Sequence, residues 1–67
     1  MTNKLRIHRT RKGISQQQLA DEMGVTRQTI YAIEKNKYSP SLELGMKIAA
    51  YFECRVEELF SLDENYE

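Results

Sequence analysis

The segment QQQLADEMGVTRQTIYAIEK, residues 16–35, constrains the fold of this chain more than any other segment. Its spacing predicts two short helices separated by Gly24, because glycine takes the positive φ of a tight turn at little steric cost. Ala20 is small at the point where two crossing helix backbones come close. The remaining apolar side chains share one inner side: Leu19, Met23, Val25, Ile30 and Ile33. The segment therefore predicts two helices that cross at a tight corner.

Capping signals define the helices before and within this segment. The first helix is expected over about 4–12, with Thr2 or Asn3 as its cap and Gly13 as its end. The second follows Ser15, which begins the capping-box pattern S-x-x-Q, and ends at residue 23. Both ends of both helices carry a recognisable signal.

The rest of the chain continues the helical pattern. Thr26 caps a third helix that is expected to reach about residue 36, before a loop that contains the single proline. Ser41 caps a fourth helix, in which Gly45 costs about 1 kcal/mol relative to alanine and suggests close packing. A fifth helix covers VEELF, residues 56–60, and no alternating run predicts a sheet. We predict an all-α, compact five-helix fold.

Length and composition bound what such a chain does. Its 67 residues predict one domain over 1–67, with a helical core at about 3–60 and a tail at 61–67. Cys54 is the only cysteine, which excludes an intrachain disulfide and a thiolate cluster for zinc. The chain also lacks a long apolar run and a signal peptide. We expect a cytoplasmic protein with no cofactor, no metal, no membrane contact and no evident small-molecule ligand.

The net charge of zero conceals an uneven distribution along the chain. Residues 1–40 contain eight basic and three acidic residues, whereas residues 41–67 contain two basic and seven acidic ones. The halves therefore differ by sign, at +5 and −5. A positive half suits contact with phosphates, while a negative half suits a position away from them.

The start of the third helix indicates which polyanion is bound. Its first turn offers Arg27 and Gln28 and no carboxylate, although helix N-termini favour acidic side chains. An arginine pairs with O6 and N7 of guanine, and a glutamine with N6 and N7 of adenine, in the major groove of DNA. The residues therefore predict that this helix reads base pairs of double-stranded DNA.

At this point the chain resembles the Xre/Cro-like helix-turn-helix family, which includes the lambdoid phage repressors. The resemblance covers about residues 3–60 and is carried by ISQQQLADEMGVTRQTIYAIEKNKYSPSLELGMKIAAYF and by VEELF. It implies a lambda-repressor-like domain in which the second and third helices form the helix-turn-helix. It also implies a small regulator of transcription.

The resemblance assigns roles to particular residues. Base contacts would come from Arg27, Gln28 and Tyr31. Arg9 and Glu34 would form an interior salt bridge that serves structure and not DNA. Phosphate contacts would come from Gln16, Lys35, Asn36, Lys37, Tyr38 and Ser41. The chain departs from the commonest family pattern at His8 and Gly45, outside the expected DNA face.

Several residues have a simpler interpretation beside the functional one. Basic side chains of the first helix either meet phosphates or only keep the protein soluble. His8 has no Cys/His partners in sequence, so packing is expected rather than metal binding or pH sensing. Cys54 is expected to fill space between helices, with redox sensing as the alternative.

The apolar C-terminal third favours a homodimer, with completion of the monomer's own core as the alternative. One helix reads few base pairs, so a symmetric pair on a palindromic operator would supply the specificity of a repressor. The expected interface residues are Tyr51, Phe52, Val56, Leu59, Phe60 and Leu62. The rival function is an antitoxin-like or other protein-interaction module. An enzyme is not expected, because no catalytic set or phosphate loop is present in the sequence.

Overall fold

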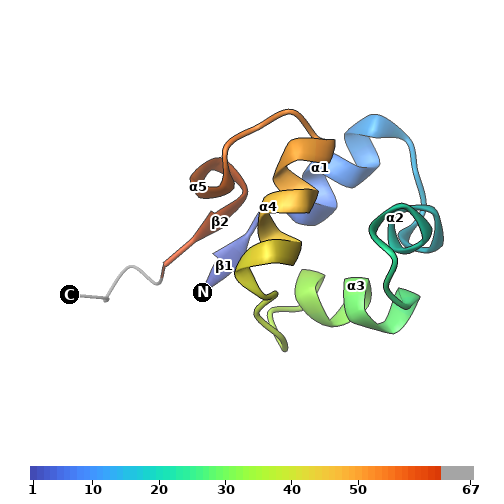
Figure 1. The fold of residues 1–67 in the computed structure, drawn as a ribbon, viewed down its shortest axis with the longest axis horizontal. Helices are drawn as coiled ribbons and strands as arrows, with labels where there is room; N and C mark the ends of the chain where they lie inside the picture. The colour runs from blue at the N-terminus through green and yellow to red at the C-terminus, as the bar shows by residue number, and fades with distance from the viewer. Residues whose placement is uncertain (63–67) are drawn as a thin grey trace.

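The computed structural model describes residues 1–62, so residues 63–67 of the predicted tail lie outside the described part. Five helices dominate the fold, together with one two-stranded sheet (Figure 1). The elements in chain order are β1 (Thr2–Asn3), α1 (Leu5–Lys12), α2 (Gln16–Met23), α3 (Arg27–Glu34), α4 (Leu42–Tyr51), α5 (Val56–Leu59) and β2 (Phe60–Ser61).

The predicted caps around α2 and α3 are confirmed. The Gln18 amide nitrogen donates to Ser15 Oγ at 3.0 Å, and the Ser15 amide nitrogen donates back to Gln18 Oε1 at 2.7 Å. The Thr29 amide nitrogen donates to Thr26 Oγ1 at 3.2 Å. Gly24 takes a φ of 73°, which forms the corner between the two helices. Local sequence signals therefore define the two helix ends and the turn that form this corner.

The boundaries of α1, α3 and α5 differ from the sequence prediction, and α4 ends at Tyr51 rather than at the predicted residue 52. Helix α3 ends at Glu34 because Asn36 takes a left-handed φ of 59°, which asparagine tolerates better than most residues. Helix α1 begins at Leu5, and the Leu5 amide nitrogen donates to Asn3 Oδ1 at 3.0 Å. Helix α5 ends at Leu59, because Phe60 already belongs to a strand.

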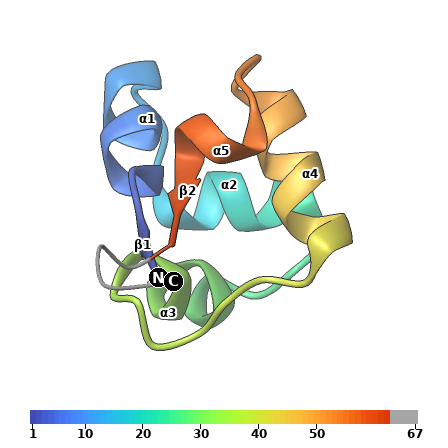
Figure 2. The same ribbon diagram turned by 90° about the vertical axis from the view of Figure 1, so that its left-hand side faces the viewer.

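The strand pair was not predicted from the sequence. Strand β1 pairs antiparallel with β2, with Thr2 opposite Ser61 and Asn3 opposite Phe60 (Figure 2). Two residues per strand are too few to produce an alternating pattern. The pair brings the N-terminus beside the end of α5 and closes one side of the helical core.

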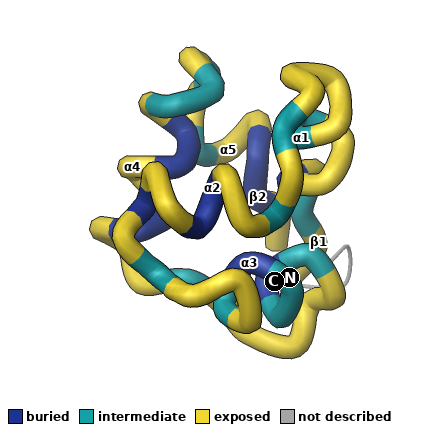
Figure 3. The backbone as a smooth tube through the Cα atoms, turned by 90° about the vertical axis from the view of Figure 1, so that its right-hand side faces the viewer, coloured by how far each residue is buried: buried dark blue, intermediate teal, exposed yellow. Residues whose placement is uncertain are grey.

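The core contains apolar side chains from all five helices and β2. In Figure 3 the buried segments of α2, α4 and β2 lie inside, and the exposed backbone surrounds them. Its members are Leu5, Leu19, Ala20, Met23, Ile30, Ile33, Leu44, Ile48, Ala49, Leu59 and Phe60. The helix-turn-helix thus packs against the rest of the domain through the inner side that its sequence predicts.

The structure corrects the predicted roles of Leu59 and Phe60. These side chains are only 1% and 9% exposed, so they complete the monomer's own core and offer almost no surface to a second copy. Gly45 is also less constrained than expected. A Cβ atom there would lie 3.7 Å from Phe60 Cε2, an ordinary contact, so alanine fits.

None of the helices within residues 1–62 has the length and apolar character needed to cross a membrane.

Candidate nucleic-acid interface

Helix α3 presents one polar face to solvent. Ile30 and Ile33 are fully buried, and they anchor the opposite face of the helix in the core. Arg27 and Gln28 are exposed on the first turn, and Tyr31 is half-buried one turn later. The three residues predicted to read bases therefore lie on one accessible surface.

The N-terminal ends of α2 and α3 favour an external anion. Neither helix has an acidic residue in its first turn, although the helix dipole leaves partial positive charge there. Backbone N–H groups at such an end bind phosphate readily. Gln16 occupies this position in α2, as Arg27 does in α3. The face is electrostatically suited to a polyanion.

The loop after α3 continues this surface. A shallow hollow on the outer side of α3 is bordered by Gln28 and by Tyr38 of the loop. Lys35 Nζ lies 5.9 Å from the centroid of the Tyr31 ring, within reach of a cation–π contact. The loop residues expected at phosphates are all exposed: Lys35, Asn36, Lys37, Tyr38 and Ser41. They therefore lie beside the predicted base-reading face.

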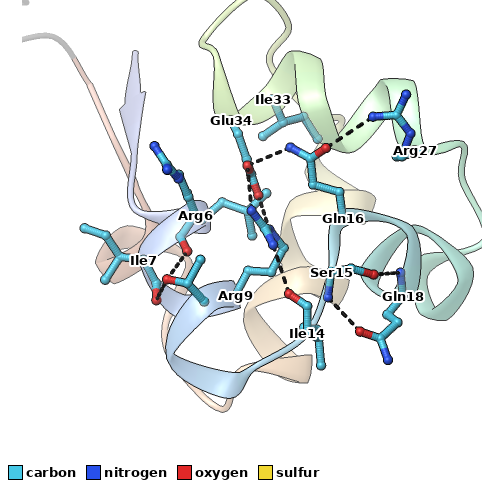
Figure 4. A network of polar contacts seen from close by, with 12 residues as sticks. Arg6, Ile7, Arg9, Ile14, Ser15, Gln16, Gln18, Arg27, Ile33 and Glu34 are labelled. Atoms are coloured by element: carbon cyan, nitrogen blue, oxygen red, sulfur yellow. Dashed lines mark hydrogen bonds and ion pairs between the residues drawn. The ribbon is translucent and has the colours of Figure 1, made fainter.

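An interior ion pair connects α1 to α3, as the family resemblance implies. Arg9 Nε lies 2.6 Å from Glu34 Oε2, and the two side chains are only 12% and 4% exposed. Arg9 Nη1 also donates to the Ile14 carbonyl oxygen at 2.9 Å. Figure 4 shows the pair between α1 and the end of α3. It fixes the C-terminal end of α3 to α1.

Gln16 differs from the other residues expected at phosphates because its side chain is already bonded within the protein. Gln16 Nε2 donates to Glu34 Oε1 at 3.0 Å, and Arg27 Nη1 donates to Gln16 Oε1 at 3.4 Å (Figure 4). A hollow beside this chain is bordered by Arg6, Arg9, Gln16, Glu34 and Lys35. Arg6 of α1 therefore lies beside the same hollow as Gln16 and Lys35.

Sequence reasoning missed the contribution of Asn3. Its Nδ2 donates to the Ile33 carbonyl oxygen at 2.8 Å and to Asn36 Oδ1 at 2.9 Å. These bonds hold the end of α3 against the strand pair. No signal in the sequence indicates them, because the partners lie 30 and 33 residues away.

His8 and Cys54, for which sensing was the alternative role, both pack against neighbouring side chains. The His8 ring lies 5.7 Å from the Phe52 ring between their centroids. Cys54 packs partly buried against the core, where desolvation and, secondarily, Glu58 raise the pKa of its thiol. Among residues 1–62, no three His, Cys, Asp or Glu side chains come together as a metal site.

Comparison with known proteins agrees with this arrangement. The model of the helix-turn-helix family matches residues 5–59. The chain therefore belongs to the helix-turn-helix family of DNA-binding transcriptional regulators.

Two relatives have similar lengths. An uncharacterized HTH-type transcriptional regulator of Methanocaldococcus jannaschii is 46% identical, over 97% of this chain and 98% of the relative. The uncharacterized HTH-type transcriptional regulator YgzD of Bacillus subtilis is 48% identical, over 96% and 97%. Among solved structures, the restriction-modification controller protein C.AhdI from Aeromonas hydrophila matches with a TM-score of 0.76 and 35% identity. That match covers 85% of this chain and 83% of C.AhdI.

Proposed function

We propose that this protein binds a specific palindromic operator as a homodimer and represses transcription from the promoter that contains it. The observation that carries the proposal is the outer face of α3, where exposed Arg27 and Gln28 begin a helix without a first-turn acid. In the major groove, Arg27 would pair with a guanine and Gln28 with an adenine. Tyr31 would contact a base edge or a thymine methyl group.

The surface around α3 would bind the DNA backbone. Lysine and arginine side chains position the protein on phosphates without reading sequence. Lys35 and Lys37 would provide this contact from the loop, together with Asn36, Tyr38 and Ser41. Gln16 would add a contact from the start of α2, and Arg6 is a further candidate because it borders the same hollow.

A matched set of variants tests these roles on a site selected from random duplex DNA. Arg27→Ala should lose about 1–3 kcal/mol and relax base preference at one position of each half-site. Lys35→Ala should weaken all sequences alike and reduce the salt dependence by about one phosphate contact. Arg55→Ala is the matched control, because it also removes one positive charge. Arg55 is 75% exposed and pairs with Glu57, so this variant should change neither the base preference nor the salt dependence. Unchanged affinity and preference in Arg27→Ala would refute the recognition surface.

A homodimer would contact twice as many base pairs as one copy of the chain. Two recognition helices about 34 Å apart would enter successive turns of the same face of DNA. With Leu59 and Phe60 buried, the apolar surface that supports dimerisation comes from other residues. Leu62 is 64% exposed, and Leu42 and Met46 of α4 are 75% and 54% exposed. The other predicted interface residues offer less exposed apolar surface, because they are partly buried: Tyr51, Phe52 and Val56.

Sedimentation measures whether this surface joins two copies. Leu42→Asp should convert a dimer to a monomer, because a carboxylate would be buried at the interface. Ile7→Asp is the matched control. Ile7 is 50% exposed on α1, and it borders a hollow that Leu42 does not line. A monomeric wild type on its selected DNA would contradict the homodimer. A stable complex with a protein of unrelated sequence would favour the interaction-module function instead.

Repression follows from occupancy. A domain that covers a promoter excludes polymerase and needs no further activity. Transcription in vitro from a template that carries the selected site should fall as protein is added, and Arg27→Ala should restore it. A rise in transcription would show activation and contradict this part of the proposal.

A further inference from the structure

We propose that Asn3 is a positioning residue for DNA binding, because it turns the side-chain amide of Asn36 so that the NH₂ group of Asn36 is offered to a phosphate. Asn3 lies in β1, and Asn36 lies in the loop after α3 that is proposed to bind the DNA backbone. The inference rests on that proposed function, since Asn36 must meet a phosphate for its orientation to matter. It gives the strand pair, outside the helix-turn-helix, a part in DNA affinity (Figure 2).

The first step is the fixed orientation of the Asn3 amide. The Leu5 amide nitrogen donates to Asn3 Oδ1 at 3.0 Å, and Asn3 Nδ2 donates to the Ile33 carbonyl oxygen at 2.8 Å. A backbone N–H only donates and a backbone carbonyl only accepts, so a reversed Asn3 amide would lose both bonds. The backbone of Asn3 is held as well, because it pairs with the buried Phe60 of β2. Asn3 therefore presents Nδ2, and not Oδ1, to the end of α3.

The second step is the orientation that Asn3 imposes on Asn36. Asn3 Nδ2 also donates to Asn36 Oδ1, at 2.9 Å. Asn36 must therefore turn its oxygen to β1, which leaves Nδ2 on the opposite branch of the amide. Within residues 1–62, Asn36 Nδ2 has no hydrogen-bond partner. Two N–H donors are thus left for a ligand outside the protein.

The third step is the fixed backbone on both sides of this amide. The Asn36 amide nitrogen donates to the Ile33 carbonyl oxygen at 3.0 Å, and the Lys37 amide nitrogen donates to the Ala32 carbonyl oxygen at 2.9 Å. Asn36 itself takes a φ of 59°, which asparagine tolerates. Because these bonds set the backbone, the bond from Asn3 decides which branch of the Asn36 amide faces outward.

The surroundings of Asn36 identify the ligand as an anion. Asn36 lies between Lys35 and Lys37, and all three residues are exposed. Asparagine side chains donate to phosphate oxygens in protein–DNA interfaces, and such contacts carry no sequence information. An amide oxygen turned to the same phosphate would repel it. The orientation set by Asn3 should therefore raise the affinity for every DNA sequence alike.

The test compares Asn3→Ser with Thr2→Ala on the selected site and on its single-base variants. A serine hydroxyl can still accept from the Leu5 amide, but it offers no amide to hold Asn36. Thr2 is the exposed neighbour on β1, and successive side chains of a strand point to opposite faces. We expect Asn3→Ser to weaken binding to every sequence by about two- to tenfold, the worth of one hydrogen bond. Ratios between sequences, and all affinities of Thr2→Ala, should stay unchanged.

A second background separates positioning from a general loss of structure. Asn36→Gly removes the side-chain amide, and glycine accepts the positive φ at this position. In this background Asn3→Ser should weaken binding no further, with folding of each variant checked by circular dichroism. A further loss there, or unchanged affinity of Asn3→Ser alone, would overturn the inference while the proposed function survives. Wild-type protein without affinity for duplex DNA would overturn both.

Replacement of single phosphates in the site by neutral methylphosphonates locates the contact. One phosphate should matter less to Asn36→Gly than to the wild type, and Asn3→Ser should lose sensitivity at that same phosphate only. An equal change at all phosphates would show a general structural effect and contradict the positioning role. Should Asn3→Ser not fold, nuclear magnetic resonance of the wild type decides. The side-chain amide signals of Asn36 should shift when the selected site is added, and unchanged signals in the complex would overturn the inference.

Discussion

Replacement of Arg9 by methionine tests how α3 is held against α1. The change preserves much of the side chain's apolar length but leaves the Glu34 carboxylate, only 4% exposed, without its cation. Loss of one partner of a buried ion pair costs about 3–5 kcal/mol, and the partial exposure of Arg9 favours the lower end. A 67-residue domain has a total stability of only roughly 3–10 kcal/mol. Arg9→Met should therefore remove a large part of it.

Urea unfolding followed by circular dichroism measures the loss. With a slope of about 1 kcal/mol per molar, the midpoint should fall by about 3 M. Arg55→Met is the matched control, because its pair with Glu57 has side chains 75% and 68% exposed and should contribute less than about 1 kcal/mol. Adding Glu34→Leu to Arg9→Met should recover stability, because it removes the buried carboxylate that has lost its ion-pair partner. Equal losses in Arg9→Met and Arg55→Met would refute the reasoning.

Three further predictions concern stability and reactivity. Gly45→Ala should raise the free energy of unfolding by about 0.5–1 kcal/mol, because its methyl group meets Phe60 at an ordinary distance; a loss of stability would show a closer fit. Asn3→Ala should lower the unfolding free energy by about 1–3 kcal/mol through its lost bonds to the end of α3, measured in urea. Cys54 should be alkylated more slowly than a free cysteine at neutral pH, because its raised pKa reduces the thiolate fraction. Glu58→Gln should speed the alkylation, because it removes the negative charge that helps to raise the pKa of Cys54. An unchanged rate would contradict this effect of Glu58.

The corner of the fold was predictable because its determinants are local. Ser15 and Thr26 cap backbone groups three residues away, and Gly24 needs only its own φ. Each signal acts within one turn of helix, so the sequence contains it in full. The outer face of α3 was predictable for the same reason, since helical periodicity separates Arg27 and Gln28 from the buried isoleucines.

Features that depend on distant partners were not predictable in this way. The strand pair joins the two ends of the described chain through only two residues on each side. Asn3 bonds to residues at the end of α3 that no spacing rule connects to it. Leu59 and Phe60 have the same apolar character as Leu62, and only the turn of the chain into β2 determines that Leu62 alone stays exposed. The connection from Glu34 to Arg27 likewise needs Gln16 placed between them in space.

Selection of bound fragments from random duplex DNA tests the central claim most directly, that residues 16–35 read a specific sequence. Wild-type protein should enrich a palindrome whose two half-sites are centred about one helical turn apart. Arg27→Ala should enrich a related palindrome in which one position of each half-site has lost its preference. Enrichment of no sequence by the wild type, or of the same sequence with the same preferences by Arg27→Ala, would contradict the account.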